Sequence, residues 1–311
     1  MTHHVAVGVD GSPEGFAAAE WAATEALLRD VPLRLVHVAD KPLTLVVAAL
    51  AIAASDDSAA GDALLQEAAA NLRARHPALE VTTRKRSGRT PAALASEGDE
   101  AGLLVLGSRG LGSVSGFLVG SVGTATVGAT TRPVVLVRSA DGGTADAVNG
   151  GTPAPGEAVE GHTGTAADSG QPLGEVVVAV DVHDPVDAPL AFAFEEAARR
   201  GCKLRAVHGW RPPFVHGLAF DAATRLEVER EFTRTLRDLL LPWRQRYPSV
   251  KVVEEAHAGS AARAVLGATG DAALVVVGRR ARRSPLGGHI GPVAHAVMHH
   301  ATAPVAIIAH G

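Results

Sequence analysis

Short apolar runs alternate with amphipathic segments through each half of the chain. In the first half, five runs have the length and composition of strands: residues 4–9, 33–38, 79–84, 103–106 and 134–137. Between the first two, Phe16, Ala19, Ala23 and Leu27 recur at helical spacing. The run 103–106 is apolar at every position, as in a strand buried on both faces of a parallel sheet. This alternation predicts an α/β fold with a doubly wound parallel sheet.

The second half repeats the first. Val7 and Val178 lie 171 positions apart, and the same offset relates Asp10 to Asp181. It also holds for later landmarks: Pro77 and Pro248, Gly107 and Gly278, Gly120 and Gly291, Pro133 and Pro304. A constant offset from the first strand to the last indicates a duplication without net insertion. The sequence therefore predicts two tandem five-stranded sheets, one for each copy.

The two copies are separated by a segment of different composition. Residues 139–174 contain no Lys, Arg or aromatic residue and are rich in Gly, Ala, Thr, Pro and Asp. Such a segment buries too little apolar area to offset the entropy of ordering, so we expect a flexible linker. The predicted domains are residues 1–138 and 175–311.

Overall charge and cysteine content exclude several classes of function. The formal net charge is -4 over 311 residues, which gives no general attraction to nucleic acid or an anionic membrane. Cys202 is the single cysteine, so an intrachain disulfide is impossible. The longest apolar run, from Leu43 to Ala54, is shorter than the roughly 18 residues of a membrane span. With no signal-peptide pattern at the start, we expect a cytoplasmic protein without nucleic-acid or membrane partners.

A segment rich in Gly and Ser, residues 107–123, carries the candidate chemistry of the first copy. It follows a buried strand and leads into a predicted helix near Gly120 and Ser121. Glycines allow close approach of the backbone, and free N–H groups at a helix start favour an anion. A surface loop has the same composition, so composition alone leaves both interpretations open. The usual P-loop and G-x-G-x-x-G signatures are absent.

The spacing of these glycines resembles a known family. Gly107-x₂-Gly110-x₉-Gly120-Ser121 is similar to the signature of the ATP-binding branch of the universal stress proteins. The first strand, which ends in Val9-Asp10-Gly11-Ser12, and the closing Pro133-Val134 resemble the same family. The resemblance implies a strand order of 3-2-1-4-5, which places Asp10 beside Gly107.

The resemblance also implies a ligand and its contacts. ATP, with Mg²⁺ as a possible companion, is the implied cofactor, and Asp10 and Val38 are expected to meet its adenosine moiety. The full implied set is Asp10, Gly11, Ser12, Val38, Gly107, Ser108, Arg109, Gly110, Gly120, Ser121, Val122 and Gly123. By itself, Asp10 also fits a turn or helix-capping carboxylate.

The second copy departs from this motif. Asp181, Gly278 and Gly291 are kept, but Ala281 stands where the first copy has Gly110, and Pro292 replaces Ser121. Proline removes a hydroxyl and a backbone N–H while remaining compatible with a first helical turn. Four arginines crowd the same loop, either as a solvated basic loop or as a charged site for an anion: Arg279, Arg280, Arg282 and Arg283. We expect the second copy to bind ATP weakly or not at all.

Other signals point away from catalysis. His295 and His299 have metal-binding spacing on a predicted helix, but no further ligand is identifiable, so no metal site is expected. No Walker lysine and no convincing catalytic base appear. The leading hypothesis is a nucleotide-binding stress or regulatory protein; slow ATP hydrolysis and a pure interaction module are the alternatives. The resemblance implies that the closing strands, from Val134 to Val137 and from Val305 to Ile308, pair as an intrachain pseudo-dimer. A homodimer is a further possibility.

Overall fold

The structure is a computed structural model, and it describes residues 4–39, 54–108, 120–139, 174–211, 221–281 and 290–311. The first half contains β1 (Val5–Gly8), α1 (Pro13–Arg29), β2 (Leu33–Ala39), α3 (Ala54–Arg75), β3 (Val81–Ser87), α4 (Thr90–Glu100), β4 (Leu103–Ser108), α5 (Ser121–Ala129) and β5 (Val134–Arg138). The second half contains β6 (Glu175–Ala179), α6 (Asp187–Arg200), β7 (Leu204–Trp210), α7 (Ala222–Arg246), β8 (Val252–Ala258), α8 (Ala261–Gly267), β9 (Ala272–Arg280), α9 (Pro292–His300) and β10 (Val305–His310).

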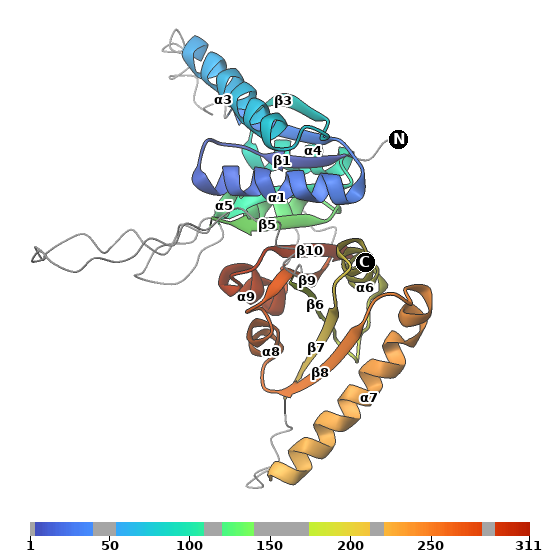
Figure 1. Ribbon diagram of the computed structural model, residues 1–311. Helices are drawn as coiled ribbons and strands as arrows, with labels where there is room; N and C mark the ends of the chain where they lie inside the picture. Colours follow the sequence, from blue (N-terminus) through green and yellow to red (C-terminus); the bar gives the residue numbers. More distant parts are fainter. Residues whose placement is uncertain (1–3, 40–53, 109–119, 140–173, 212–220, 282–289) are drawn as a thin grey trace, which may run out of the picture.

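All ten strands form one continuous sheet. Its order is β3-β2-β1-β4-β5-β10-β9-β6-β7-β8, so each half has the predicted order 3-2-1-4-5 (Figure 1). Within each half the described strand pairs are parallel, whereas β5 and β10 pair antiparallel, with Val135 opposite Ala306. The expectation of two tandem parallel sheets is corrected to one mixed sheet. Pairing of the last strands removes two edges that would otherwise expose unpaired backbone groups.

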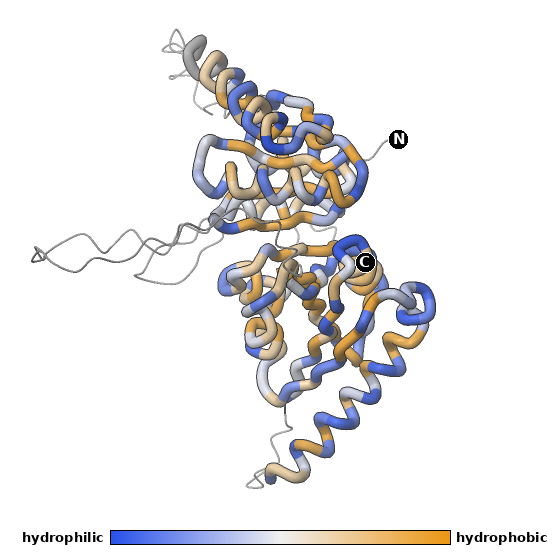
Figure 2. The backbone as a smooth tube through the Cα atoms, in the orientation of Figure 1, coloured by the Kyte–Doolittle hydropathy of each residue, from blue (hydrophilic) through white to orange (hydrophobic). Residues whose placement is uncertain are grey.

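The helices cover both faces of the sheet. One core lies beneath α1, α3, α6 and α7 and includes Leu65, Phe194 and Leu236. The other lies beneath α4, α5, α8 and α9 and includes Leu94 and Met298. Apolar colour accordingly concentrates along the central strands, while polar and apolar residues alternate along α7 (Figure 2). Among the described helices, none is both long and apolar enough to cross a membrane.

Several element ends differ from the sequence predictions. The third strand begins at Val81 and continues to Ser87, although its second half is Arg84-Lys85-Arg86 and lacks apolar alternation. The helix α4 begins at Thr90, and Arg89 occupies the cap position without a side-chain hydrogen bond. Pro91 does lie in the first turn, where its missing N–H costs no helical hydrogen bond.

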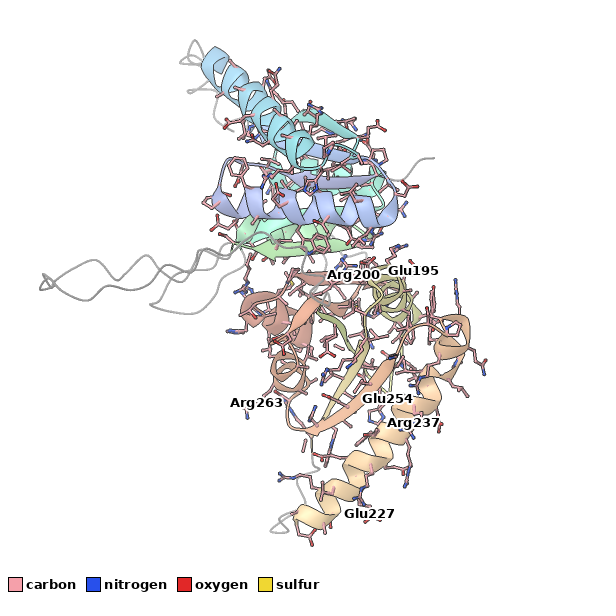
Figure 3. The ribbon with its side chains drawn as sticks, viewed as in Figure 1. Glu195, Arg200, Glu227, Arg237, Glu254 and Arg263 are labelled. Atoms are coloured by element: carbon pink, nitrogen blue, oxygen red, sulfur yellow. The ribbon has the colours of Figure 1, made fainter. Side chains whose placement is uncertain are left out.

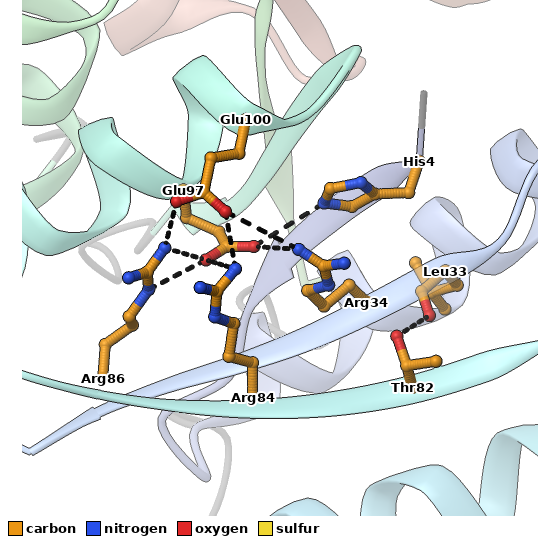
Figure 4. Close-up of polar contacts among 8 residues, drawn as sticks. All are labelled: His4, Leu33, Arg34, Thr82, Arg84, Arg86, Glu97 and Glu100. Atoms are coloured by element: carbon orange, nitrogen blue, oxygen red, sulfur yellow. Dashed lines mark hydrogen bonds and ion pairs between the residues drawn. The ribbon is translucent and has the colours of Figure 1, made fainter. Parts of the chain in front are cut away.

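A cluster of charged side chains anchors α4 to the outer strands. Glu97 of α4 is fully buried and accepts from Arg34 of β2 at 2.9 Å and Arg86 of β3 at 3.0 Å. The remaining members of the cluster are His4, Arg84 and Glu100 (Figure 4). Burial acts to raise the pKa of Glu97, but the hydrogen bonds from Arg34 and Arg86 and the nearby guanidinium charges outweigh it and lower the pKa overall. Glu97 therefore stays ionised and holds α4 in place.

Equivalent residues meet where the two halves join. Glu25 and Arg29 of α1 correspond by the repeat offset to Glu196 and Arg200 of α6, and the four side chains form one ionic cluster. Arg29 reaches Glu196 at 2.5 Å, while Arg200 pairs with Glu25. Figure 3 shows Arg200 at this junction. Both glutamates are at most 1% exposed, so each depends on an arginine of the other half. Each half therefore contributes an arginine to the buried glutamate of the other.

Two further arginines cross the junction. Arg138, at the end of β5, donates to the carbonyl oxygens of Met298 and His299 at 3.1 and 2.6 Å, where α9 ends. Arg279 of β9 donates to the carbonyl oxygen of Thr130 at 2.6 Å, where α5 ends. A guanidinium suits a helix C-terminus because the last carbonyls lack intrahelical donors and carry partial negative charge. Each half therefore caps a helix of the other.

Candidate functional site

A cavity of about 300 Å³ opens at the carboxyl ends of β1 and β4. These two strands are neighbours, and the chain leaves them in opposite directions along the sheet, which is where open α/β sheets bind ligands. Its lining comes from Gly8, Val9, Asp10, Ser12, Glu14, Gly15, Val36, His37, Val38, Thr90, Leu94, Leu106, Gly107, Gly120, Ser121, Val122 and Gly123. Eight of the twelve residues expected from the sequence lie on this list: Asp10, Ser12, Val38, Gly107, Gly120, Ser121, Val122 and Gly123.

The entry to α1 holds Asp10 in a defined turn. The backbone N–H of Ser12 donates to Asp10 Oδ1 at 3.0 Å, and the Ser12 hydroxyl donates to the same oxygen. Ser12 Oγ in turn accepts from the Gly15 N–H at 3.1 Å and caps the helix. Gly11 has a φ of 83°, which glycine adopts without strain. Asp10 is therefore both a turn residue and an exposed carboxylate on the cavity wall.

Gly107 allows β4 to lie directly against α1. A Cβ at this position would come within 2.6 Å of the Glu14 carbonyl carbon and 2.8 Å of the Gly15 nitrogen. Any side chain would therefore push α1 away from the end of the strand. The glycine lines the cavity, and it also sets the position of the helix that carries Glu14.

The start of α5 forms the opposite wall. Gly120 occupies the N-cap without a side-chain hydrogen bond, and the Thr124 N–H is bonded to the Gly120 carbonyl at 3.1 Å. The N–H groups of Ser121, Val122 and Gly123 precede that bond and have no intrahelical acceptor. A Cβ built on Gly120 meets no atom of the described residues within 4 Å, so these residues leave space before the helix. Three donors and the positive end of the helix dipole thus border an open volume suited to an anion.

The cavity floor is apolar, and part of it escaped the sequence analysis. Leu94, Leu106 and Val36 are almost fully buried beneath the exposed polar rim. His37 of β2 lines the cavity, and its Nδ1 bonds to the Val9 carbonyl at 2.9 Å. Thr90 also lines the cavity, because α4 begins at the same edge of the sheet. The Thr90-Pro91 helix start was the available signal for that contact.

Four expected residues are not brought to the cavity or lie outside the described chain. Ser108 is 2% exposed, and its hydroxyl has no hydrogen-bond partner among the described residues. Gly11 shapes the turn without lining the cavity. Arg109 and Gly110, like Arg282 and Arg283 of the second copy, lie outside the residues that the structure describes.

The second copy has its own cavity at the equivalent edge, with a volume of about 620 Å³. Asp181, Gly278 and Gly291 line it, and the His183 N–H donates to Asp181 Oδ1 at 3.0 Å, which preserves the first turn. However, α6 begins only at Asp187, and its cap residue Val186 makes no side-chain hydrogen bond. The residue before a proline disfavours helical geometry, so Pro185 delays the helix start. The cavity is correspondingly wider here.

Charge also differs between the cavities. Arg211 and Arg280 line the second cavity, and Arg280 pairs with Asp184, whereas the described lining of the first cavity contains no Lys or Arg. Burial, followed by the charge of Arg280, lowers the pKa of His310 at this edge and keeps its imidazole neutral. No group of three or more potential metal ligands occurs in the part of the chain that the structure describes. The rings of His295 and His299 lie 4.3 Å apart.

Comparison with known proteins gives one consistent family. A family model described as the universal stress protein family matches residues 1–138 and 173–309. The chain is 31% identical to universal stress protein Rv2005c of Mycobacterium tuberculosis over 313 residues, covering 98% of this chain and 96% of the relative. The crystal structure of a universal stress protein from Archaeoglobus fulgidus superposes with a TM-score of 0.68 at 15% identity, with full coverage of both chains.

Proposed function

Because the chain belongs to the universal stress protein family, we propose that its first domain binds an adenine nucleotide, ATP with Mg²⁺, and that the protein is a nucleotide-dependent regulator. The proposed domains are residues 1–138 and 175–311, with residues 139–174 as the connection. The observation that carries the proposal is the convergence of an apolar floor, an exposed carboxylate and a helix N-terminus on one cavity.

The parts of this cavity match the parts of a nucleotide. Val36, Val38 and Leu94 offer the apolar surface that a purine ring requires. The N–H groups of Ser121, Val122 and Gly123 suit phosphate oxygens. The Asp10 carboxylate on the cavity wall is an oxygen ligand of the type Mg²⁺ prefers, and the ion would offset part of the charge of a triphosphate.

The described cavity favours binding over turnover. Ser12 engages the Asp10 carboxylate through two hydrogen bonds, which hold the carboxylate in the turn before α1. We therefore assign this chain a regulatory role, in which bound nucleotide changes the surface around the cavity. Pairing of β5 with β10 is proposed to hold the two domains together in solution as an intrachain pseudo-dimer.

Calorimetric titration with ATP·Mg²⁺ tests the proposal. The wild-type chain is expected to bind, and Gly120→Val is expected to lose binding by more than about 100-fold, because the valine fills the space of the phosphates. The variant should fold, since Gly120 has a φ of -55° and no neighbour within 4 Å of a built Cβ. Absence of binding by the wild-type chain, or undiminished binding by a folded variant, would refute the proposal.

A further inference from the structure

One wall of the second cavity is aromatic, and three of its four side chains stand at positions that carry small residues in the first domain. By the repeat offset, His183 replaces Ser12, Trp210 replaces Ala39 and Phe232 replaces Gly61. Together with His208, they form what we call the aromatic wall: His183, His208, Trp210 and Phe232, all of which line the cavity. The Phe232 ring lies 4.9 Å from His208, 5.6 Å from Trp210 and 6.0 Å from His183 between centroids.

The aromatic wall lies on the opposite face of the sheet from the position equivalent to the apolar floor of the first cavity, which is formed by Val36, Leu94 and Leu106. In the first domain, Val36 packs in the core beneath α4. In the second domain, the counterpart of Val38 is Gly209, where a Cβ would lie 2.4 Å from the Ala261 Cα at the start of α8. The start of α8 therefore lies close against β7, while Val207, Val265 and Val277 still line the cavity on that face. His208 and Trp210 alternate with Gly209 along β7, so they point to the other face, toward Phe232 of α7.

His208 contributes a buried polar atom without a partner. Its side chain is 4% exposed, and its Nδ1 lies 3.0 Å from the Val180 carbonyl oxygen. A carbonyl oxygen can only accept, so Nδ1 carries the hydrogen, and Nε2 of the neutral ring carries a lone pair. Nε2 is buried without a hydrogen-bond partner among the described residues. A buried acceptor of this kind is stabilised by a ligand that donates a hydrogen bond.

The acidic end of the ligand is defined by Arg280 and α9. Arg280 lines the cavity and is 63% exposed at its side chain, where Asp184 is its surface partner. Gly291 caps α9 without a side-chain hydrogen bond, and Pro292 offers no N–H, so Val293 and Ala294 supply the free donors of the first turn. This is one donor fewer than in α5, and the Ser121 hydroxyl is missing as well. The arrangement suits one acidic group better than a triphosphate.

We propose that the second domain binds a flat aromatic acid with a hydrogen-bond donor on its ring, at a site separate from the nucleotide cavity. The ring packs against the aromatic wall and donates to His208 Nε2. The acidic group lies between Arg280 and the first turn of α9. Offset or edge-to-face packing of aromatic rings and a charge-assisted hydrogen bond are the two sources of affinity.

Calorimetry on the full-length chain with indole-3-acetate as the probe tests this site. One equivalent per chain is expected. Indole-3-acetamide, which lacks the charge, and naphthalene-1-acetate, which lacks the ring N–H, are each expected to bind several-fold more weakly. Phe232→Ala should weaken binding of indole-3-acetate by about tenfold through loss of ring packing. His183→Ser, an exposed substitution that restores the residue of the first domain, should weaken it about threefold and covers the case in which Phe232→Ala does not fold.

Arg280→Gln separates the charge from the ring. It should weaken binding of indole-3-acetate but leave indole-3-acetamide unchanged. Gly120→Val, in the first domain, should leave the probe unaffected, so the result does not depend on ATP binding there. The proposal is overturned if the wild-type chain shows no saturable binding, if Gly120→Val abolishes binding, or if ATP displaces the probe as tightly as it binds the first domain.

Discussion

The two domains share a sheet and an interface but differ at the edge where ligands bind. Glu25 and Arg29 have the same partners by symmetry as Glu196 and Arg200, and both halves have the same strand order. The cavities at the carboxyl edges differ, in contrast. The first has a volume of about 300 Å³ and is bordered by a helix start with free N–H groups, whereas the second has a volume of about 620 Å³ and an aromatic wall. The buried strands and the interface are therefore compatible with extensive change in the loops, and the fold alone does not indicate which ligand each domain binds.

The largest expected effect is a loss of stability at the junction, which both domains build from equivalent residues. Glu196→Ala and Glu25→Ala should each lower the free energy of unfolding by about 3–5 kcal/mol, because each leaves Arg29 and Arg200 to share a single buried carboxylate. Guanidinium-induced unfolding measures both. Glu195→Ala is the control, since the side chain of Glu195 is 40% exposed and pairs only with Arg199 among the described residues, so the expected loss is within about 0.5 kcal/mol. Markedly unequal losses at the two equivalent positions would contradict the symmetric interface.

The contact of Arg279 with the Thr130 carbonyl has no equivalent made by the first domain, because the counterpart of Arg279 there is Ser108. Arg279→Ser should lower the free energy of unfolding by about 2 kcal/mol, since the Thr130 carbonyl at the end of α5 loses a buried charged donor. Hydrogen exchange should locate the change in α5 of the first domain. Arg280→Ser is the neighbouring control, and an equal effect there would refute a specific role for the cap.

A reciprocal exchange sharpens the difference between the helix starts. Ser121→Pro should weaken ATP binding about fivefold by removing one N–H and one hydroxyl, while Pro292→Ser should strengthen ATP binding in the second domain by a similar factor. Both substitutions introduce a residue that the first helical turn tolerates. Calorimetry on both variants measures the effect. No change in either direction would show that these donors do not contact phosphate.

The smallest effect is a pH dependence confined to the first domain, where Glu97 has Ala268 as its counterpart. The pKa of Glu97 is lowered in the folded state, so its stabilising contribution is complete above the ordinary value near 4.5 and is lost as the pH falls through the lowered value. The pKa of His4 is lowered by burial and then by the Arg34 charge, so its contribution is likewise lost below about 6.5. Thermal unfolding from pH 7 to pH 3 should show a shallower acid loss in Glu97→Gln than in the wild-type chain. Parallel curves would contradict this assignment.

Sequence periodicity predicted the α/β class because runs such as 103–106 are apolar at each position and are buried as expected. It did not predict that β5 and β10 join the halves into one sheet; that expectation came from the family resemblance. The strand β3 was placed two residues too early because its charged end is stabilised by ion pairs with α4 instead of by apolar burial.

The family resemblance, and not residue spacing alone, placed Asp10 and Gly120 at one site. Asp10 and Gly120 lie on the cavity because the chain places both at the carboxyl edge of adjacent strands. His37 and Leu94 were missed because nothing local distinguishes them from ordinary strand and helix residues. The aromatic wall was missed for the same reason: Phe232 and Trp210 are distant in sequence and meet only through packing of α7 on β7.

The most direct test of the account is the number of ATP molecules bound per chain, measured by calorimetry for the wild type, Gly120→Val and Gly291→Val. Both glycines are N-cap residues with no neighbour within 4 Å of a built Cβ, so the two substitutions are matched. The account predicts one tight equivalent in the wild type and in Gly291→Val, and none in Gly120→Val. Two equal tight equivalents in the wild type, each lost with one substitution, would contradict the division of the two domains between different ligands.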